Sequence, residues 1–245
     1  MRFIRSLFAR PQTPKPRPER ATVMVVGMHR SGTSFLTGSL QQAGLELGNI
    51  SAWNPHNLKG NRENLDIVQF SDEVLEKRGY AWDRPPAEAI EWTADEVARA
   101  QRLIAGYASV SYWGFKDPRS LLLVEGWQHL LPELQFVGIF RHPTAVAQSL
   151  AVRGGMPEGQ AFALWLAYNQ RLLKLYRQSP FPILCFDESE AQLHRKLDQV
   201  IDELGLQPPS SERFFSAELK HHGHERKRIP RELDKLYREL RRCAR

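Results

Sequence analysis

Residues 22–34, TVMVVGMHRSGTS, decide the fold of this chain. The first five residues form a continuous apolar run, which is typical of a strand buried in a parallel sheet. The run ends at Gly27, and the spacing from Gly27 to Gly32 is that of a phosphate-binding loop between a strand and a helix. The backbone N–H groups of such a loop, with the N-terminus of the next helix, bind an anion. The sequence therefore predicts a strand, an anion-binding loop and a helix that begins near Thr33.

This loop lacks the lysine of the enzymes that hydrolyse ATP or GTP. Their loop continues G-K-[ST], so that the lysine reaches the β- and γ-phosphates and the hydroxyl holds Mg²⁺. Here Thr33 takes the lysine position and the cation of the loop is Arg30. No apolar strand ends in an aspartate that would hold magnesium, and the strand predicted at 135–140 ends in Arg141 instead. Hydrolysis of ATP or GTP is not expected, and no metal site is predicted.

Helices and strands alternate along the rest of the chain. Apolar runs predict three further strands. One ends at residue 116, and the other two span 135–140 and 181–186. Helical periodicity predicts helices at 33–43, 63–77, 93–109, 121–131, 143–152, 160–177, 188–204 and 230–242. Thr93 and Glu96 form a capping box at the start of one of them. This alternation favours an α/β, P-loop NTPase-like three-layer fold, with a central parallel sheet flanked by helices and ligands at the carboxyl ends of the strands.

The net charge of +6 is concentrated in the two ends of the chain. Residues 1–21 carry about +5 and residues 220–245 about +6, which leaves the middle near −5. A nucleic-acid-binding domain should carry its basic face on the folded core, so no nucleic-acid partner is expected. We expect a flexible basic leader at 1–21, able at most to make a weak peripheral membrane contact. A single domain at 22–245, ending in a basic helix, should follow.

Two further global features bear on the compartment. No apolar run approaches the roughly 20 residues that a membrane-spanning helix needs. Cys185 and Cys243 are the only cysteines, and they form neither a disulfide framework nor a CxxC metal pair. A reducing, cytoplasmic location is therefore expected.

A second candidate anion site follows the strand at 135–140. Arg141 stands directly after this strand, at the predicted carboxyl edge of the sheet, and Ser149 lies eight residues later on the next predicted helix. An arginine and a serine this far apart are weak evidence in isolation, because both reach one phosphate only if the intervening loop folds back.

Taken together, the two sites resemble those of a known family. Residues 30–34, RSGTS, resemble the 5′-phosphosulfate loop of sulfotransferases that use 3′-phosphoadenosine 5′-phosphosulfate (PAPS). Arg141 with Ser149 resembles their 3′-phosphate site, and the resemblance spans roughly residues 22–180. Arginine in the loop is similar to the tyrosylprotein and bacterial branches of the family. The resemblance implies transfer of a sulfuryl group from PAPS to an acceptor hydroxyl. The PAPS-binding residues that it implies are His29, Arg30, Ser31, Gly32, Thr33, Ser34, Arg141 and Ser149.

A third segment, GFKDPR at 114–119, is similar to the K-D-P segment of the tyrosylprotein enzymes. The resemblance implies that Lys116 faces the transferring sulfuryl group, with Arg30 as the other catalytic cation. A fixed lysine at the end of a strand suits this role, because sulfuryl transfer places charge on the bridging and peripheral oxygens. The alternative is that Lys116 and Asp117 form a structural ion pair beside a proline turn.

The base that removes the acceptor proton has three candidates: Glu63, His56 and His29. Glu63 is preferred, because it follows the irregular segment 54–62 where the family's catalytic acid or histidine usually falls. The alternative for Glu63 is that it only complements the dipole of the helix predicted at 63–77. His56 is the second choice, and His29 is expected to neighbour the nucleotide.

Two rival functions stay open. A P-loop kinase acting on a small molecule would bind Mg²⁺-ATP, and a non-catalytic binding module would keep the fold while Glu63 and Lys116 faced away from the nucleotide. By analogy alone, we expect the acceptor to be a glycan, lipid or small molecule. Specificity for it should lie in the segment 45–62 and the helices after it. The C-terminal R-K-G motif of the cytosolic enzymes is missing, and the tail offers only ERKR at 225–228.

Overall fold

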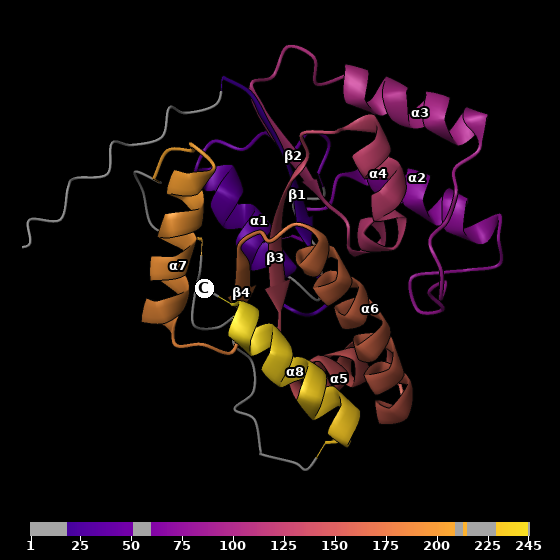
Figure 1. Ribbon diagram of the computed structural model, residues 1–245, viewed down its shortest axis with the longest axis vertical. Coiled ribbons are helices and arrows are strands. Elements are labelled where there is room, and N and C mark those ends of the chain that lie inside the picture. The colour runs from indigo at the N-terminus through magenta and orange to yellow at the C-terminus, as the bar shows by residue number, and fades with distance from the viewer. Residues whose placement is uncertain (1–18, 51–59, 209–212, 215–228, 245) are drawn as a thin grey trace, which may run out of the picture.

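The computed structural model describes residues 19–50, 60–208, 213–214 and 229–244. Its centre is a sheet of four parallel strands in the order β2-β1-β3-β4 (Figure 1). These strands are β1 (Ala21–Val26), β2 (Tyr112–Lys116), β3 (Gln135–Phe140) and β4 (Ile183–Cys185). Because every pair is parallel, all four carboxyl ends meet at one edge, where the residues that follow the strands are brought together.

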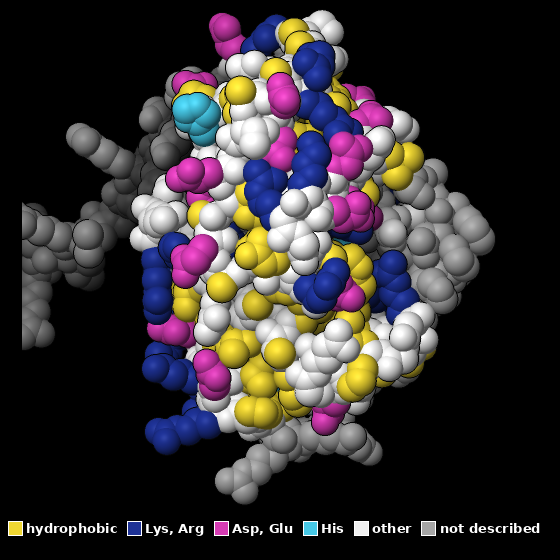
Figure 2. Space-filling model, turned by 90° about the vertical axis from the view of Figure 1, so that its right-hand side faces the viewer, with side chains coloured by type: hydrophobic (Ala, Val, Ile, Leu, Met, Phe, Trp, Pro, Cys, Tyr) yellow, Lys and Arg dark blue, Asp and Glu magenta, His cyan; other side chains and the backbone are white. Residues whose placement is uncertain are grey.

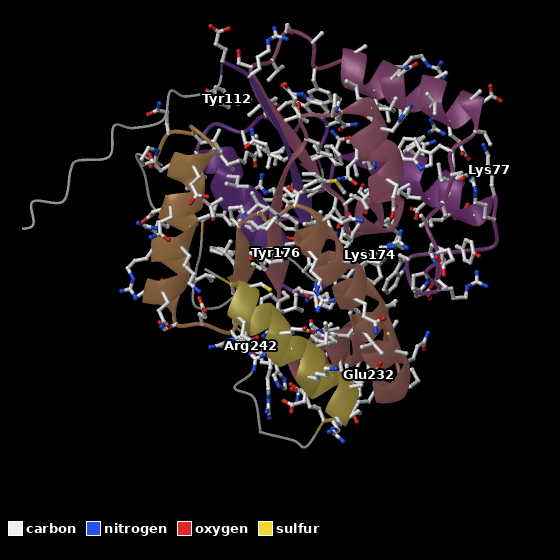
Figure 3. The ribbon with its side chains drawn as sticks, in the orientation of Figure 1. Lys77, Tyr112, Lys174, Tyr176, Glu232 and Arg242 are labelled. Atoms are coloured by element: carbon white, nitrogen blue, oxygen red, sulfur yellow. The ribbon has the colours of Figure 1, made fainter. Side chains whose placement is uncertain are left out.

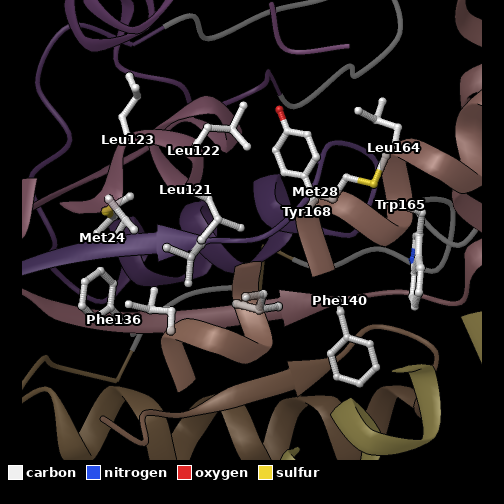
Figure 4. Packing of buried hydrophobic residues seen from close by; sticks show 14 of the residues in the cluster. Met24, Met28, Leu121, Leu122, Leu123, Phe136, Phe140, Leu164, Trp165 and Tyr168 are labelled. Carbon is white, nitrogen blue, oxygen red and sulfur yellow. The ribbon is translucent and has the colours of Figure 1, made fainter. Parts of the chain in front are cut away.

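Helices cover both faces of this sheet, so the three-layer α/β fold is confirmed. On one face lie α1 (Thr33–Gln42) and α7 (Glu190–Glu203), and the remaining helices lie on the other face or at its lower edge (Figure 1). The alternation of β1 explains the two cores, because successive side chains of a strand point to opposite faces. Val23 and Val25 pack with α1 and α7. Met24 and Val26 pack with the larger cluster of the other face, part of which Figure 4 shows.

The other helices lie close to their predicted positions. They are α2 (Leu65–Glu76), α3 (Ala94–Ala105), α4 (Val124–Leu130), α5 (Pro143–Gly154), α6 (Glu158–Gln178) and α8 (Arg231–Cys243). The capping box is confirmed, since Thr93 and Glu96 exchange hydrogen bonds at the start of α3. The helix predicted at 121–131 is in fact a 3₁₀ helix, η1 (Pro118–Leu123), followed by the short α4. Asp117 caps η1 and Pro118 occupies its first turn, so the helical turns begin earlier than predicted.

Several predictions fall outside the described residues in whole or in part. Residues 1–18 of the leader, residues 51–59 of the predicted specificity segment 45–62, His56 within them, and the 225–228 segment lie there. Among the residues that the structure does describe, no helix is long and apolar enough to cross a membrane. The face shown in Figure 2 carries Lys and Arg side chains interspersed with Asp and Glu side chains.

Candidate functional site

The loop after β1 has the backbone of an anion-binding turn. Arg30 and Gly32 have positive φ angles of 64° and 91°. A Cβ added at Gly32 would lie 2.4 Å from the ring of Phe186, so only glycine fits this position. Gly32 is the N-cap of α1, and no side chain caps the helix. The first N–H groups of α1 therefore have no capping side chain, which suits them to bind a ligand anion.

Arg30 joins this loop to the second predicted anion segment. Its Nε donates a hydrogen bond of 2.8 Å to Oγ of Ser149 on α5. Burial, followed by the charges of Arg153 and Arg141, lowers the pKa of Arg30, which shows that three guanidinium groups crowd this region. No carboxylate of the described residues pairs with Arg30 or Arg153. The region thus carries positive charge that an anion would balance.

Arg141 stands at the carboxyl end of β3, as predicted. Its side chain is largely buried, and its guanidinium carbon lies 5.3 Å from the centre of the Phe186 ring. Burial lowers the pKa of Arg141, and the nearby carboxylate of Asp187, 4.0 Å from Nε, opposes this effect. Phe186 therefore contacts both predicted anion groups, the loop at Gly32 and the guanidinium of Arg141.

Lys116 and Glu63 form a buried ion pair. Nζ of Lys116, the last residue of β2, donates to Oε1 of Glu63 at 2.9 Å. The lysine side chain is 2% exposed and the glutamate 15%. The alternative pairing of Lys116 with Asp117 is wrong, because Asp117 pairs with Arg119.

Glu63 lies outside the helix that was predicted to begin with it. Helix α2 begins at Leu65, after the N-cap Asn64, whose side chain accepts a hydrogen bond from the N–H of Ile67. The acid in the first turn is Asp66. Glu63 therefore lies before the first turn of α2, and its carboxylate bonds to Lys116.

Arg30, Lys116 and Glu63 line one polar pocket, whereas Ser31, Gly32, Arg141 and Ser149 are not part of its lining. Its lining combines the loop, the ion pair and two further arginines with one tryptophan: His29, Arg30, Thr33, Ser34, Asn61, Glu63, Trp82, Lys116, Pro118, Arg119 and Arg153. Ser34 also donates from Oγ to the carbonyl oxygen of Asn61 at 3.0 Å. Cations outnumber carboxylates on the lining, so the pocket favours an anionic ligand.

Two buried polar atoms of the loop have no hydrogen-bond partner. They are Oγ of Ser31 and Nε2 of His29. Burial, and then the charges of Arg119, Lys116 and other cations, hold the pKa of His29 well below 6.5, so its imidazole is neutral. The ring of His29 packs 4.8 Å from that of Trp82. Since buried polar groups in native proteins are almost always bonded, these orphans fit a loop that completes its hydrogen bonds with a ligand.

The sequence did not single out five residues of this lining. Pro118 and Arg119 lie in the quoted 114–119 segment and Asn61 in the irregular segment 54–62, so a signal for these three was present. Arg153 in the last turn of α5 and Trp82 in the connection between α2 and α3 had none. Among the described residues, no group of three or more His, Cys, Asp or Glu side chains could hold a metal ion.

Comparisons with known proteins bear on the fold. No protein-family model and no curated protein matches this sequence. Among solved structures, the sulfotransferase domain of the Synechococcus PCC 7002 olefin synthase matches with a TM-score of 0.57 and 16% identity, over 94% of this chain and 98% of that domain. This chain shares the fold of that domain.

Two other solved structures match less closely. A sulfotransferase from Mycobacterium tuberculosis H37Rv has a TM-score of 0.45 and 14% identity, over 77% of this chain and 68% of its own. A protein from Thermus thermophilus has a TM-score of 0.46 and 16% identity, over 76% of this chain and 98% of its own.

Proposed function

We propose that this chain is a sulfotransferase that transfers a sulfuryl group from PAPS to a hydroxyl group of an acceptor. One observation carries the proposal: the loop cation Arg30 and the buried pair of Lys116 and Glu63 face the same polar pocket. The sulfotransferase fold supports it. Arg30 and the 114–119 segment favour the bacterial and tyrosylprotein branch of the family.

The donor would be held at two separate anion sites. The N–H groups at the start of α1 and the loop side chains would bind the 5′-phosphosulfate, and the orphaned Oγ of Ser31 fits this role. The loop side chains in question are His29, Arg30, Ser31, Thr33 and Ser34, with Gly32 allowing close approach of the backbone. Arg141 and Ser149 would bind the 3′-phosphate. The bond from Arg30 to Ser149 shows that the two segments are neighbours, as one nucleotide spanning both requires.

Lys116 and Glu63 would divide the chemistry between them. In the transfer, the acceptor oxygen forms a bond to sulfur while the bond from sulfur to the bridging phosphate oxygen breaks. The charge of Lys116 stabilises the bridging oxygen as negative charge grows there. Glu63 accepts the proton of the acceptor hydroxyl, and its bond to Lys116 keeps the carboxylate directed at the same pocket.

The rival functions predict different behaviour. A kinase would need a cation at the position of Thr33 to reach the β- and γ-phosphates, and Thr33 supplies none. A non-catalytic module would leave Glu63 and Lys116 turned away from the loop, whereas both line its pocket. We propose an acceptor hydroxyl on a glycan, lipid or small molecule in the cytoplasm.

Isothermal titration of the full chain tests the donor. We expect adenosine 3′,5′-bisphosphate to bind with micromolar affinity, and AMP or Mg²⁺-ATP to bind much more weakly. Arg141→Ala should remove the advantage of the bisphosphate over AMP. Incubation with PAPS and a panel of hydroxyl compounds should then release the bisphosphate. Tight Mg²⁺-ATP binding with no response to the bisphosphate would replace this proposal with the kinase.

A further inference from the structure

A hydrogen-bond cluster from the C-terminal helix stands behind Arg141. Its centre is the carboxylate of Asp187, two residues after β4. Oδ2 of Asp187 accepts hydrogen bonds from the backbone N–H of His142 at 2.6 Å and from the hydroxyl of Tyr237, on α8, at 3.1 Å. The thiol of Cys185 donates to the same oxygen at 3.7 Å. One carboxylate oxygen thus ties together β4, the start of α5 and α8.

The two side-chain donors of this cluster stay protonated. Burial, and then the charge of Asp187, raise the pKa of the Cys185 thiol to about 11. The same two causes raise the pKa of the Tyr237 hydroxyl above its usual value. At neutral pH both groups therefore donate to the carboxylate of Asp187, whose Oδ2 accepts three hydrogen bonds.

The other oxygen of this carboxylate serves Arg141. Oδ1 of Asp187 lies 4.0 Å from Nε of Arg141. Burial disfavours the charge of this guanidinium, and Arg30 and Arg141 are close enough to repel each other. A carboxylate at this distance offsets part of these costs, because its charge attracts the guanidinium while burial still holds the pKa of Arg141 below its usual value.

Tyr237 is held in place from two sides. Its ring packs edge-on against those of His142, at 4.8 Å, and Phe140, at 5.7 Å. The helix itself is anchored by Leu233, Leu236 and Leu240, which are buried in the core that α6 shares. Figure 1 shows α8 lying across the lower end of the sheet, beside α5 and α6.

We propose that Asp187 and Tyr237 are positioning residues that hold Arg141 and the start of α5 for the 3′-phosphate of the nucleotide, so that helix α8 forms part of the nucleotide site. This inference rests on the proposed function. It gives α8 a role in the half of the site where the R-K-G motif of the cytosolic enzymes is missing.

Two variants of the full chain test this proposal, Tyr237→Phe and Asp187→Asn. Tyr237→Phe keeps the ring and removes only the hydroxyl that reaches Asp187, so the fold should survive. The affinities for adenosine 3′,5′-bisphosphate and for AMP, which lacks the 3′-phosphate, are measured by titration. We expect about a tenfold loss of bisphosphate affinity in Tyr237→Phe, the effect of one hydrogen bond to a charged group. AMP affinity should change less than about twofold, because AMP does not reach Arg141.

Tyr176→Phe is the matched control. Tyr176 lies on α6 (Figure 3), packs edge-on against Phe181 and belongs to no contact of the Asp187 cluster. Loss of the Tyr176 hydroxyl should leave the affinities for adenosine 3′,5′-bisphosphate and AMP unchanged.

Three outcomes would overturn the proposal. Unchanged bisphosphate affinity in both variants would show that the cluster does not act on Arg141. An equal loss of AMP and bisphosphate affinity would show a general structural role. If the unmodified chain bound neither nucleotide, the proposed function itself would fail, and this result is distinguishable because it does not depend on the variants.

Discussion

Two partly buried ion pairs differ in how completely they are bonded. Arg78 forms a two-pronged pair with Glu96, with both distances 2.8 Å. Arg78 also donates to the carbonyl oxygens of Val74 and Glu91, and Glu96 accepts from the N–H of Thr93. Lys116 and Glu63, by contrast, share a single hydrogen bond.

The number of hydrogen bonds distinguishes a structural ion pair from one that can still bond to a ligand. The first pair closes the capping box of α3 and joins α3 to the residues after α2, so its hydrogen-bonding capacity is used inside the protein. An ammonium group carries three donors, and a carboxylate accepts several bonds. Lys116 and Glu63 therefore keep unused capacity, and both line a pocket. A buried pair that is incompletely bonded beside a pocket is the stronger candidate for a functional pair.

Replacing Lys116 should give the largest effect. In Lys116→Met we expect sulfuryl transfer from PAPS to fall by about 10²–10³-fold, because the charge that we propose for the bridging oxygen is lost. Adenosine 3′,5′-bisphosphate should still bind, since it lacks the transferring group. The rate is measured as bisphosphate release with the best acceptor of the panel. Full turnover in this variant would remove the distinction between the two pairs.

Replacing Glu96 should affect stability instead. Glu96→Gln breaks the pair with Arg78 and weakens the cap of α3, so the free energy of unfolding should fall by about 3 kcal/mol. Urea unfolding measures this change. Bisphosphate affinity should stay at the level of the unmodified chain at temperatures where the variant is folded. A loss of affinity without a loss of stability would reverse the assignment.

The smallest expected effect concerns pH and His29. Burial and the cations around the pocket hold its pKa in the folded protein below the value of about 6.5 of an unfolded chain. Below pH 6.5 the imidazole of His29 therefore binds a proton in the unfolded chain but not in the folded chain. The free energy of unfolding falls as pH falls. His29→Gln should remove this dependence, so the two unfolding free energies should diverge between pH 7.5 and 5.5.

Two acids, Asp117 and Glu96, also make the stability of the folded chain depend on pH. The pKa of Asp117 is raised to about 6, mainly by burial, so its protonation favours the folded chain as pH falls, the opposite sign to His29. Arg78 lowers the pKa of Glu96, so the stability from that pair is lost only in more acidic solution, from about pH 4.5 downward. Both acids are present in both proteins, and their contributions cancel in the difference. Parallel pH profiles would show that His29 is not desolvated as described.

Much of the fold could be predicted because its signals are local. The apolar runs of β1 and β3 and the capping box at Thr93 each lie within a few residues of sequence. The division of residues 118–130 into η1 and α4 could not be predicted. The buried residues Leu121, Leu122 and Leu123 suit either kind of helix, and the cap at Asp117 decides where the first begins.

The candidate site could be predicted only in its parts. Arg30, Lys116 and Arg141 can be predicted from sequence, because each ends or follows a strand or lies in a glycine-rich loop. Which of them lie together depends on the strand order β2-β1-β3-β4, which differs from the order along the chain. Contacts such as that from Arg30 to Ser149 join residues 119 positions apart, and no local pattern indicates them. Asp187 and Tyr237 carried no signal for the same reason.

The ring of Phe186 has a consequence for selectivity. It fills the space beside Gly32 and lies against the guanidinium of Arg141, so one rigid, flat ring contacts both anion groups. Its thickness, unlike the length of a lysine or arginine side chain, does not adjust to the ligand. The protein should thus accept only a narrow range of distances between the two phosphates. Adenosine 2′,5′-bisphosphate should therefore bind more weakly than its 3′,5′ isomer.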